Sequence, residues 1–162
     1  MLNTTRLAAN HVLPILLNKV KRYHSAREWA TKLKTHELYV YGKESLAYLE
    51  TKAELAKSLY WLGHKAKAEV RTKSIFEALI KSLNPELLGV FEGVEESLRG
   101  SIRLKYLEAL ADCLAQFKRI NTASSLKFLV VISRNLFILD VSNSVKGREI
   151  LTKLNDCWNS LI

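Results

Sequence analysis

The chain has 162 residues, of which 48% are hydrophobic, and this length fits one domain with a sizeable core. Six glycines and two prolines are too few for a β-sandwich or barrel, which turns every roughly 8–12 residues. The net charge is +9, and residues 1–81 carry 15 Lys and Arg against seven Asp and Glu. This positive N-terminal half favours an anionic partner such as nucleic acid, an acidic protein or an anionic membrane.

Cysteine content and the N-terminus bear on the compartment. Cys113 and Cys157 are too few for a disulfide framework, which indicates a reducing, cytoplasmic location. Residues 1–27 contain five basic residues and no acid, as mitochondrial presequences do, so a mitochondrial location is the alternative. The most apolar stretch, residues 128–141, is interrupted by Arg134 and is shorter than the roughly 20 residues of a membrane span. We therefore expect no membrane span.

Start and stop signals predict eight helices joined by short connections. They are expected at about 4–22, 25–41, 44–62, 64–83, 85–98, 101–119, 122–140 and 144–161. Short connections make neighbouring helices antiparallel. The expected fold is all-α, a single domain over 1–162 with hairpins at about 4–41, 44–83 and 101–140, an extra helix at 85–98 and a C-terminal capping helix at 144–161.

Single residues define several of these boundaries. Pro14 predicts a kink or a late start in the first helix. Ser25 and Glu28 form the pattern of a capping box, which predicts the start of the second helix. Gly42 and Gly63 follow amphipathic runs and are typical of glycines that end helices in the left-handed conformation.

An apolar pattern with spacings of 6, 4, 3 and 6 residues occurs three times. Its members are Leu7, Leu13, Leu17, Val20 and Ala26, then Leu49, Leu55, Leu59, Leu62 and Ala68, then Leu104, Leu110, Leu114, Phe117 and Ala123. With Asn84–Pro85 after the second hairpin, this spacing resembles the tetratricopeptide repeat. The resemblance implies a right-handed superhelix of stacked hairpins. Because these helices are longer than the roughly 34-residue repeat allows, an irregular helical bundle is the alternative.

The C-terminal third shows a second resemblance. The segment 110–116, Ala123 and the expected helix 144–161 are similar to the end of the small tetratricopeptide chaperones of type III secretion. That resemblance implies a chaperone of three repeats closed by a capping helix.

By the tetratricopeptide resemblance, the first helix of each hairpin lines a concave groove for a peptide or helix of a protein partner. The groove residues expected are Asn18, Lys19, Lys57, Tyr60, Trp61, Asp112 and Gln116. Because Tyr60 and Trp61 are adjacent, they cannot share one face of a helix, so one ring is expected to be exposed and to anchor the partner. We expect a non-enzymatic adaptor or chaperone whose basic residues steer an acidic partner.

The densest basic run supports a different class of function. It consists of Lys65, Lys67, Arg71 and Lys73. A positive patch is sufficient to bind a phosphate backbone without regard to sequence, so the alternative is a nucleic-acid-binding subunit. A solvated, solubilising face is a further explanation of the same residues.

A third hypothesis is a ribonuclease. Arg6 and His11, five residues apart, resemble the motif of the helical HEPN ribonucleases, which implies that Arg6 holds a phosphate and His11 acts as acid or base. The family prefers a polar residue after the arginine, where this chain has Leu7. The four histidines lack metal-ligand spacing. We therefore expect no catalytic residue, metal or cofactor, and the oligomeric state stays open.

Overall fold

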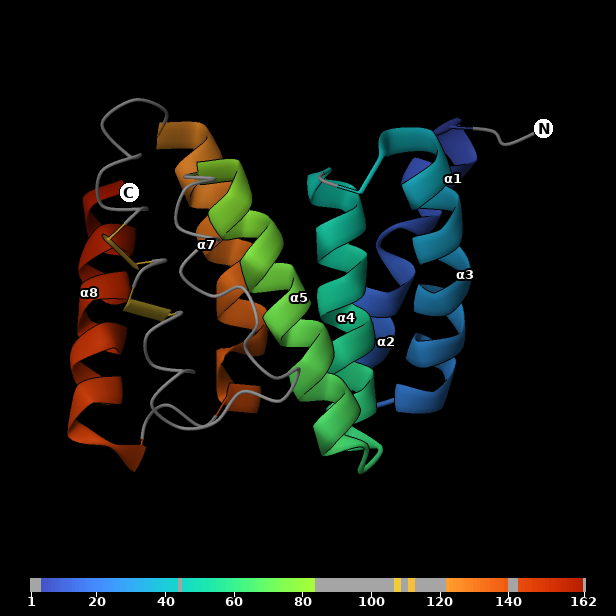
Figure 1. Cartoon of the computed structure of the whole chain (residues 1–162). Helices are drawn as coiled ribbons and strands as arrows, with labels where there is room; N and C mark the ends of the chain where they lie inside the picture. Colours follow the sequence, from blue (N-terminus) through green and yellow to red (C-terminus); the bar gives the residue numbers. More distant parts are fainter. Residues whose placement is uncertain are drawn as a thin grey trace. The chain divides into compact units, whose positions relative to one another are not determined.

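The computed structural model describes residues 4–43, 45–83, 107–108, 111–112, 122–139 and 143–161. Every element in these ranges is helical (Figure 1) and none is a strand, so the predicted all-α class is confirmed for this part of the chain. Where the sequence predicts one domain, the chain divides into two compact units, Met1–Ile75 and Phe76–Ile162.

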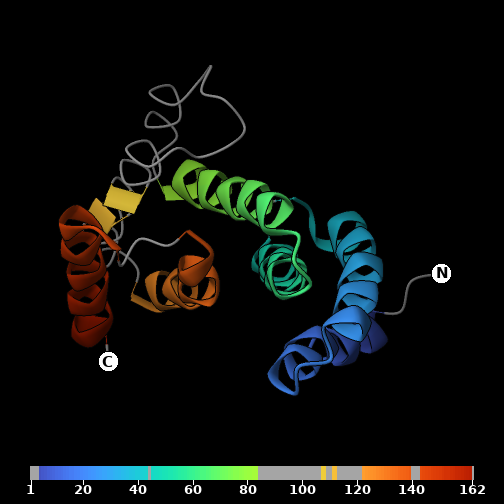
Figure 2. The same ribbon diagram turned by 90° about the horizontal axis from the view of Figure 1, so that it is seen from below.

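The first unit is built around one central helix. Its helices are α1 (Thr4–Asn10), α2 (Leu13–Lys19), α3 (Tyr23–Tyr41), α4 (Leu46–Trp61) and the start of α5 (Lys65–Leu83). Helix α4 packs against α3 and α2, and Figure 2 shows it between these helices and α5. The buried side chains of α4 include Leu49, Ala53, Leu55, Ala56 and Leu59. This burial on several sides makes α4 the core of the unit.

The first predicted helix is interrupted, and the second begins earlier than its capping box predicts. Pro14 occupies the first turn of α2, where its missing N–H needs no partner, and α1 ends before it. Lys21 adopts a left-handed φ of 64°, and the Arg22 N–H donates to the Leu17 carbonyl oxygen at 2.8 Å. Because this reversal already turns the chain, α3 starts at Tyr23. The prediction that a capping box at Ser25 starts this helix is therefore wrong.

The end of α4 matches its prediction. Gly63 has a φ of +93°, its N–H donates to the Tyr60 carbonyl oxygen at 3.1 Å, and the His64 N–H donates to that of Leu59 at 2.8 Å. These two bonds form a Schellman motif closed by a left-handed glycine. Gly42, after α3, also has a positive φ of 92° but an extended ψ of 165°, so it ends its helix in a different conformation.

The second unit contains α7 (Thr122–Asn135), the short 3-10 helix η2 (Leu136–Leu139) and α8 (Val145–Leu161). Helix α7 packs on α8, and the residues buried in this unit include Ile132 of α7 and Ile150 of α8. The Ser144 Oγ accepts a hydrogen bond from the Gly147 N–H at 2.9 Å, which fixes the start of α8 within one residue of the predicted start at about 144. Asn84–Pro85, the expected helix 85–98, most of 101–119 and most of the third copy of the apolar pattern lie outside the described residues.

Two observations apply to the described residues only. No helix in the described ranges is long and apolar enough to cross a membrane. The same ranges bring together no group of three or more His, Cys, Asp or Glu side chains that could hold a metal ion.

Candidate functional site

A set of buried polar side chains joins the turn before α2 to α3 and α4. The His11 Nδ1 lies 2.8 Å from the Glu37 Oε2, and its Nε2 lies 3.3 Å from the Glu50 Oε2. The Thr51 hydroxyl donates to the other Glu37 carboxylate oxygen. Glu37 is only 1% exposed, and a buried carboxylate needs a partner of opposite charge. His11 is placed to supply that charge.

His11 is held in its protonated form. Hydrogen bonds to Glu37 and Glu50 raise the pKa of His11 from 6.5 to about 9, against the burial that lowers it. A protonated imidazole cannot accept a proton, and a pKa this high makes it a weak general acid near neutral pH. The geometry therefore favours a structural role for His11 over the acid–base role that the ribonuclease resemblance implies.

The set continues along α4 through Asn18. The Asn18 Nδ2 donates to the Glu54 Oε2 at 2.7 Å and to the Glu54 carbonyl oxygen at 3.0 Å. The Ser58 hydroxyl donates to the Asn18 Oδ1 at 3.0 Å. Asn18 is 3% exposed, so its prediction as a groove residue is wrong. It is a buried bridge between α2 and α4, because the hydrogen-bonding groups of Glu54 and Ser58 need a polar partner there.

This arrangement gives three of the six glutamates of the first unit internal partners. Residues 1–75 contain 14 Lys and Arg but only six Glu. Glu37 and Glu54 are buried, and Glu50 is hydrogen-bonded to His11. The outer surface of this unit is therefore more positive than its composition alone indicates.

Three aromatic rings gather where α3 begins and α4 ends. Trp61 stacks on Tyr23 with ring centroids 6.1 Å apart, and it meets Tyr60 at nearly a right angle with centroids 5.1 Å apart. The Lys65 Nζ lies 5.5 Å from the Tyr60 ring centroid, within the range of a cation–π interaction. Trp61 is 52% exposed while Tyr60 is half-buried, which confirms that one of the two rings faces solvent. We call Tyr23, Tyr60, Trp61 and Lys65 the aromatic cluster.

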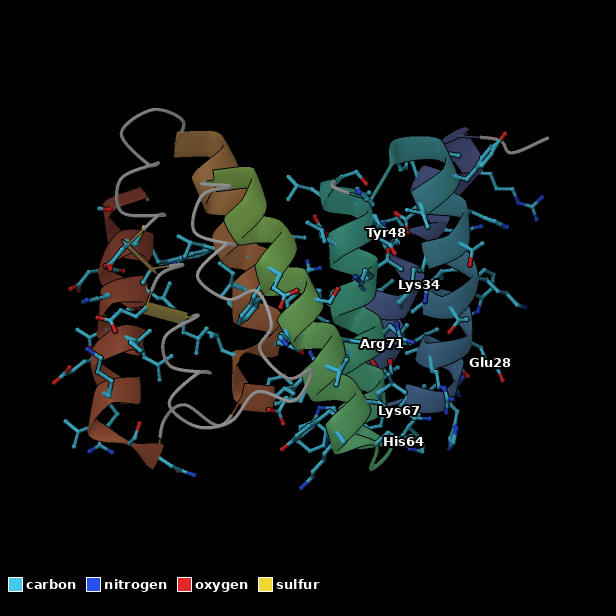
Figure 3. All side chains as sticks on the ribbon, in the orientation of Figure 1. Glu28, Lys34, Tyr48, His64, Lys67 and Arg71 are labelled. Atoms are coloured by element: carbon cyan, nitrogen blue, oxygen red, sulfur yellow. The ribbon has the colours of Figure 1, made fainter. Side chains whose placement is uncertain are left out.

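A second positive feature lies between α4 and α5. A cavity of about 580 Å³ is lined by Lys52, Ala66, Lys67, Val70, Arg71 and Ser74. The Lys52 Nζ donates to the Ser74 hydroxyl at 2.9 Å. Burial and the positive charge of Arg71 lower the pKa of Lys34, on α3. Figure 3 shows Lys34, Arg71 and Lys67 one below the other along this side of the first unit. We call Lys34, Lys52, Lys67 and Arg71 the basic groove.

The predicted basic patch is divided by the geometry of α5. Lys67 and Arg71 line the cavity together, and Lys65 belongs to the aromatic cluster. Lys73 is 8% exposed, so its place in an exposed patch is wrong. Two residues beyond Arg71 on a helix, Lys73 points away from the cavity side and into the packed side of α5.

The predicted peptide groove is brought together only in part. Tyr60 and Trp61 belong to the aromatic cluster, Lys57 on the same helix is half-buried, and Lys19 is exposed at the end of α2. Asp112 lies in the second unit, where the Lys153 Nζ is 3.7 Å from its Oδ1. A further predicted member, at position 116, lies outside the described residues.

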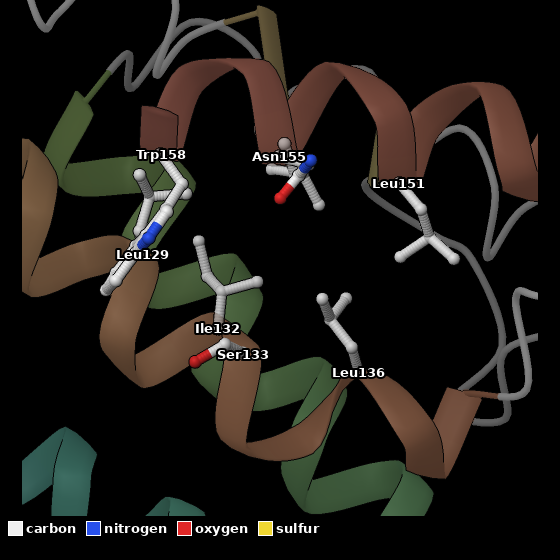
Figure 4. Close-up of a pocket in the computed structure, with 8 residues that line it drawn as sticks. Leu129, Ile132, Ser133, Leu136, Leu151, Asn155 and Trp158 are labelled. Carbon is white, nitrogen blue, oxygen red and sulfur yellow. The ribbon is translucent and has the colours of Figure 1, made fainter. Parts of the chain in front are cut away.

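The second unit contains an apolar cavity between α7 and α8 (Figure 4). Its volume is about 340 Å³, and it is lined by Leu129, Ile132, Ser133, Leu136, Leu151, Leu154, Asn155 and Trp158. Ligand pockets commonly start near 300 Å³, but none of these side chains carries a charge. This cavity differs in chemistry from the two positive features of the first unit.

Comparison of the chain with models of protein families, with characterised proteins and with solved structures gave no significant match. The described part of the chain is therefore placed only in a broad class, that of helical proteins, and its first unit has a positive surface that displays aromatic rings. Its function is therefore argued from the chain's own residues.

Proposed function

We propose that the first unit is a non-enzymatic adaptor or chaperone module that holds an acidic segment of a protein partner. The observation that carries this proposal is the separation of charge. Glu37 and Glu54 are buried and hydrogen-bonded inside the unit, while most cations and the exposed Trp61 lie on its surface. An acidic partner is attracted and oriented by such a field.

Trp61 is the proposed anchor for an apolar side chain of the partner. Tryptophan is enriched among the residues that dominate binding energy, and this ring is already packed on Tyr23 and Tyr60. Because the ring is held before binding, little conformational entropy is lost when a partner covers it. Lys65 beside Tyr60 places a cation next to the anchor for a carboxylate of the same segment.

The test uses the full chain and a fluorescein-labelled amphipathic peptide of Glu and Leu, with a matched peptide in which Lys replaces every Glu. We expect fluorescence anisotropy to show binding of the Glu peptide only, and Trp61→Ala to weaken it about tenfold, or roughly 1.4 kcal/mol. Tyr39→Ala is the matched control, since Tyr39 is an aromatic residue of the same unit and is 82% exposed. Equal affinity for both peptides would overturn the proposal.

The way in which the hairpins of the first unit pack on one another is also a proposal. We propose that the hairpins of the first unit stack as tetratricopeptide repeats do. Ala26 and Ala68, the alanines of the first two copies of the apolar pattern, are both 0% exposed, as close backbone contact at these positions requires. Ala26→Leu should then lower the free energy of unfolding by roughly 1–3 kcal/mol through overpacking, measured in urea, and an unchanged stability would contradict close packing at this alanine.

A nucleic-acid-binding subunit is the second candidate. Cation–π pairs of Lys65 with Tyr60 and of Lys32 with Trp29 place charges beside partly exposed rings, as single-strand binders do. Binding of random RNA and DNA that falls steeply with salt, and that Lys67→Glu abolishes, would favour this candidate.

A further inference from the structure

We infer that the basic groove binds a phosphate monoester carried by a side chain of the acidic partner segment. This inference rests on the proposed function and adds the chemistry of one subsite to it. The occupant would be a phosphorylated residue, seated among Lys34, Lys52, Lys67 and Arg71.

Cations of α4 and α5 line the cavity, and Lys34 of α3 lies close enough to feel the charge of Arg71. Lys52 is held in place by its hydrogen bond to Ser74, while Lys67 and Arg71 line the same cavity from α5. Lys34 approaches from α3, where burial and the charge of Arg71 lower its pKa. Like charges gathered in partly desolvated space repel one another, and a bound anion relieves that repulsion.

Three of the four cations of the basic groove have no acidic partner among the described residues. Across the part of the chain that the structure describes, neither Lys34, Lys67 nor Arg71 forms an ion pair with an acidic side chain. Elsewhere in the first unit the acids Glu37 and Glu54 are buried and bonded. The charge of these three side chains is thus available to a ligand.

A phosphate monoester fits this number of cations better than a carboxylate does. It carries about −1.5 to −2 charges at neutral pH and three strong acceptor oxygens. The guanidinium of Arg71 can bind two of these oxygens at once, while Lys52 and Lys67 meet the remaining charge. A single carboxylate would balance only one of the cations.

The surroundings favour a peptide over a nucleic acid as the carrier. Strand binders stack bases on aromatic rings, and no aromatic residue is among the described side chains that line the cavity. The nearby Tyr48 ring is already partnered, since the Lys52 Nζ lies 5.4 Å from its centroid. Val70, 38% exposed, instead provides an apolar wall for a neighbouring residue of the partner.

The test compares three short fluorescein-labelled peptides on the full chain, with the same Glu and Leu residues and a central phosphoserine, serine or glutamate. We expect the phosphoserine peptide to bind about tenfold more tightly than the other two. Arg71→Gln should remove most of this difference and change the affinity for the serine peptide by less than about twofold. Lys43→Gln is the matched control, because Lys43 is exposed in the same unit and outside the groove, and it should preserve the difference.

The outcomes separate the two proposals. Equal binding of the phosphoserine and serine peptides would overturn the phosphate site and leave the proposed function standing. Absence of binding by all three peptides would overturn both. A single-stranded RNA oligonucleotide that displaces the phosphopeptide at an equal phosphate concentration would assign the groove to nucleic acid and reject the peptide phosphate. The exposed Lys67 offers a second variant, Lys67→Gln, if Arg71→Gln fails to fold.

Discussion

The buried ion pairs of His11 should make the stability of the first unit fall above neutral pH. Glu37 and Glu50 raise the pKa of His11 from 6.5 to about 9. A group whose folded pKa is raised contributes stability that is complete below the unfolded value and disappears as the pH passes the folded value. The loss should therefore occur between about pH 6.5 and about pH 9.

The size of the effect follows from the same shift. A change from 6.5 to about 9 corresponds to roughly 3 kcal/mol at most. The side chains of His11 and Glu50 are 19% and 26% exposed, and water and salt screen that part of the pair. We therefore expect about 2 kcal/mol of the free energy of unfolding to depend on His11 protonation.

Urea unfolding of the natural chain and of His11→Gln, at about pH 6 and about pH 9.5, measures the part of the free energy of unfolding that depends on His11 protonation. The natural chain should be more stable than the variant at the lower pH, and the difference should shrink by about 2 kcal/mol at the higher pH. His24→Gln is the control, because His24 is exposed and should leave the pH dependence unchanged. A difference between the natural chain and His11→Gln that stays constant or grows with pH would refute the reasoning.

Three further changes test the packing of the first unit, each measured as the free energy of unfolding in urea. Lys21→Gly should stabilise by about 1 kcal/mol, because Lys21 has a φ of 64° that glycine adopts without strain. Lys19→Gly, within α2, should destabilise by a similar amount. The opposite order of stabilities would contradict the left-handed turn. Leu49→Ala should cost about 3 kcal/mol, since Leu49 is 1% exposed. Leu16→Ala, at a position 53% exposed, should cost less than about 0.5 kcal/mol. Equal losses for the two variants would place α4 outside the core. Asn18→Asp should destabilise strongly near pH 7, because it places a second carboxylate beside that of Glu54. Stability should recover partly as the pH falls and one of the two carboxylates is protonated. A loss of stability that does not depend on pH would refute the contact between residues 18 and 54.

Much of the fold could be predicted from the sequence because its signals are local. Start and stop signals placed α4 and α5 to within two residues, and Gly63 ends α4 in the left-handed conformation expected of it. Ser25 misled because a capping box is a pattern of side chains, whereas the start of α3 is set by the backbone turn at Lys21.

The site was less predictable because it depends on which face of a helix meets a neighbour. Asn18 and Lys73 have the residue types of a surface, yet both are buried, and a sequence does not show that Asn18 finds Glu54 on another helix. Lys52 was missed for the same reason, since it lies 19 residues before Arg71 and joins it only after α4 and α5 have packed. The exposed member of the Tyr60–Trp61 pair needed the structure to identify it.

The central claim is that the first unit binds an acidic protein segment in preference to nucleic acid, and a direct competition tests it. The full chain is loaded with the fluorescein-labelled Glu and Leu peptide, and random-sequence single-stranded RNA is added across a salt series. We predict that the peptide stays bound and that its affinity falls less steeply with salt than that of RNA, because contact with Trp61 adds an apolar contribution that salt does not screen. RNA that displaces the peptide at micromolar concentration, with an affinity that falls steeply as salt rises, would contradict the account.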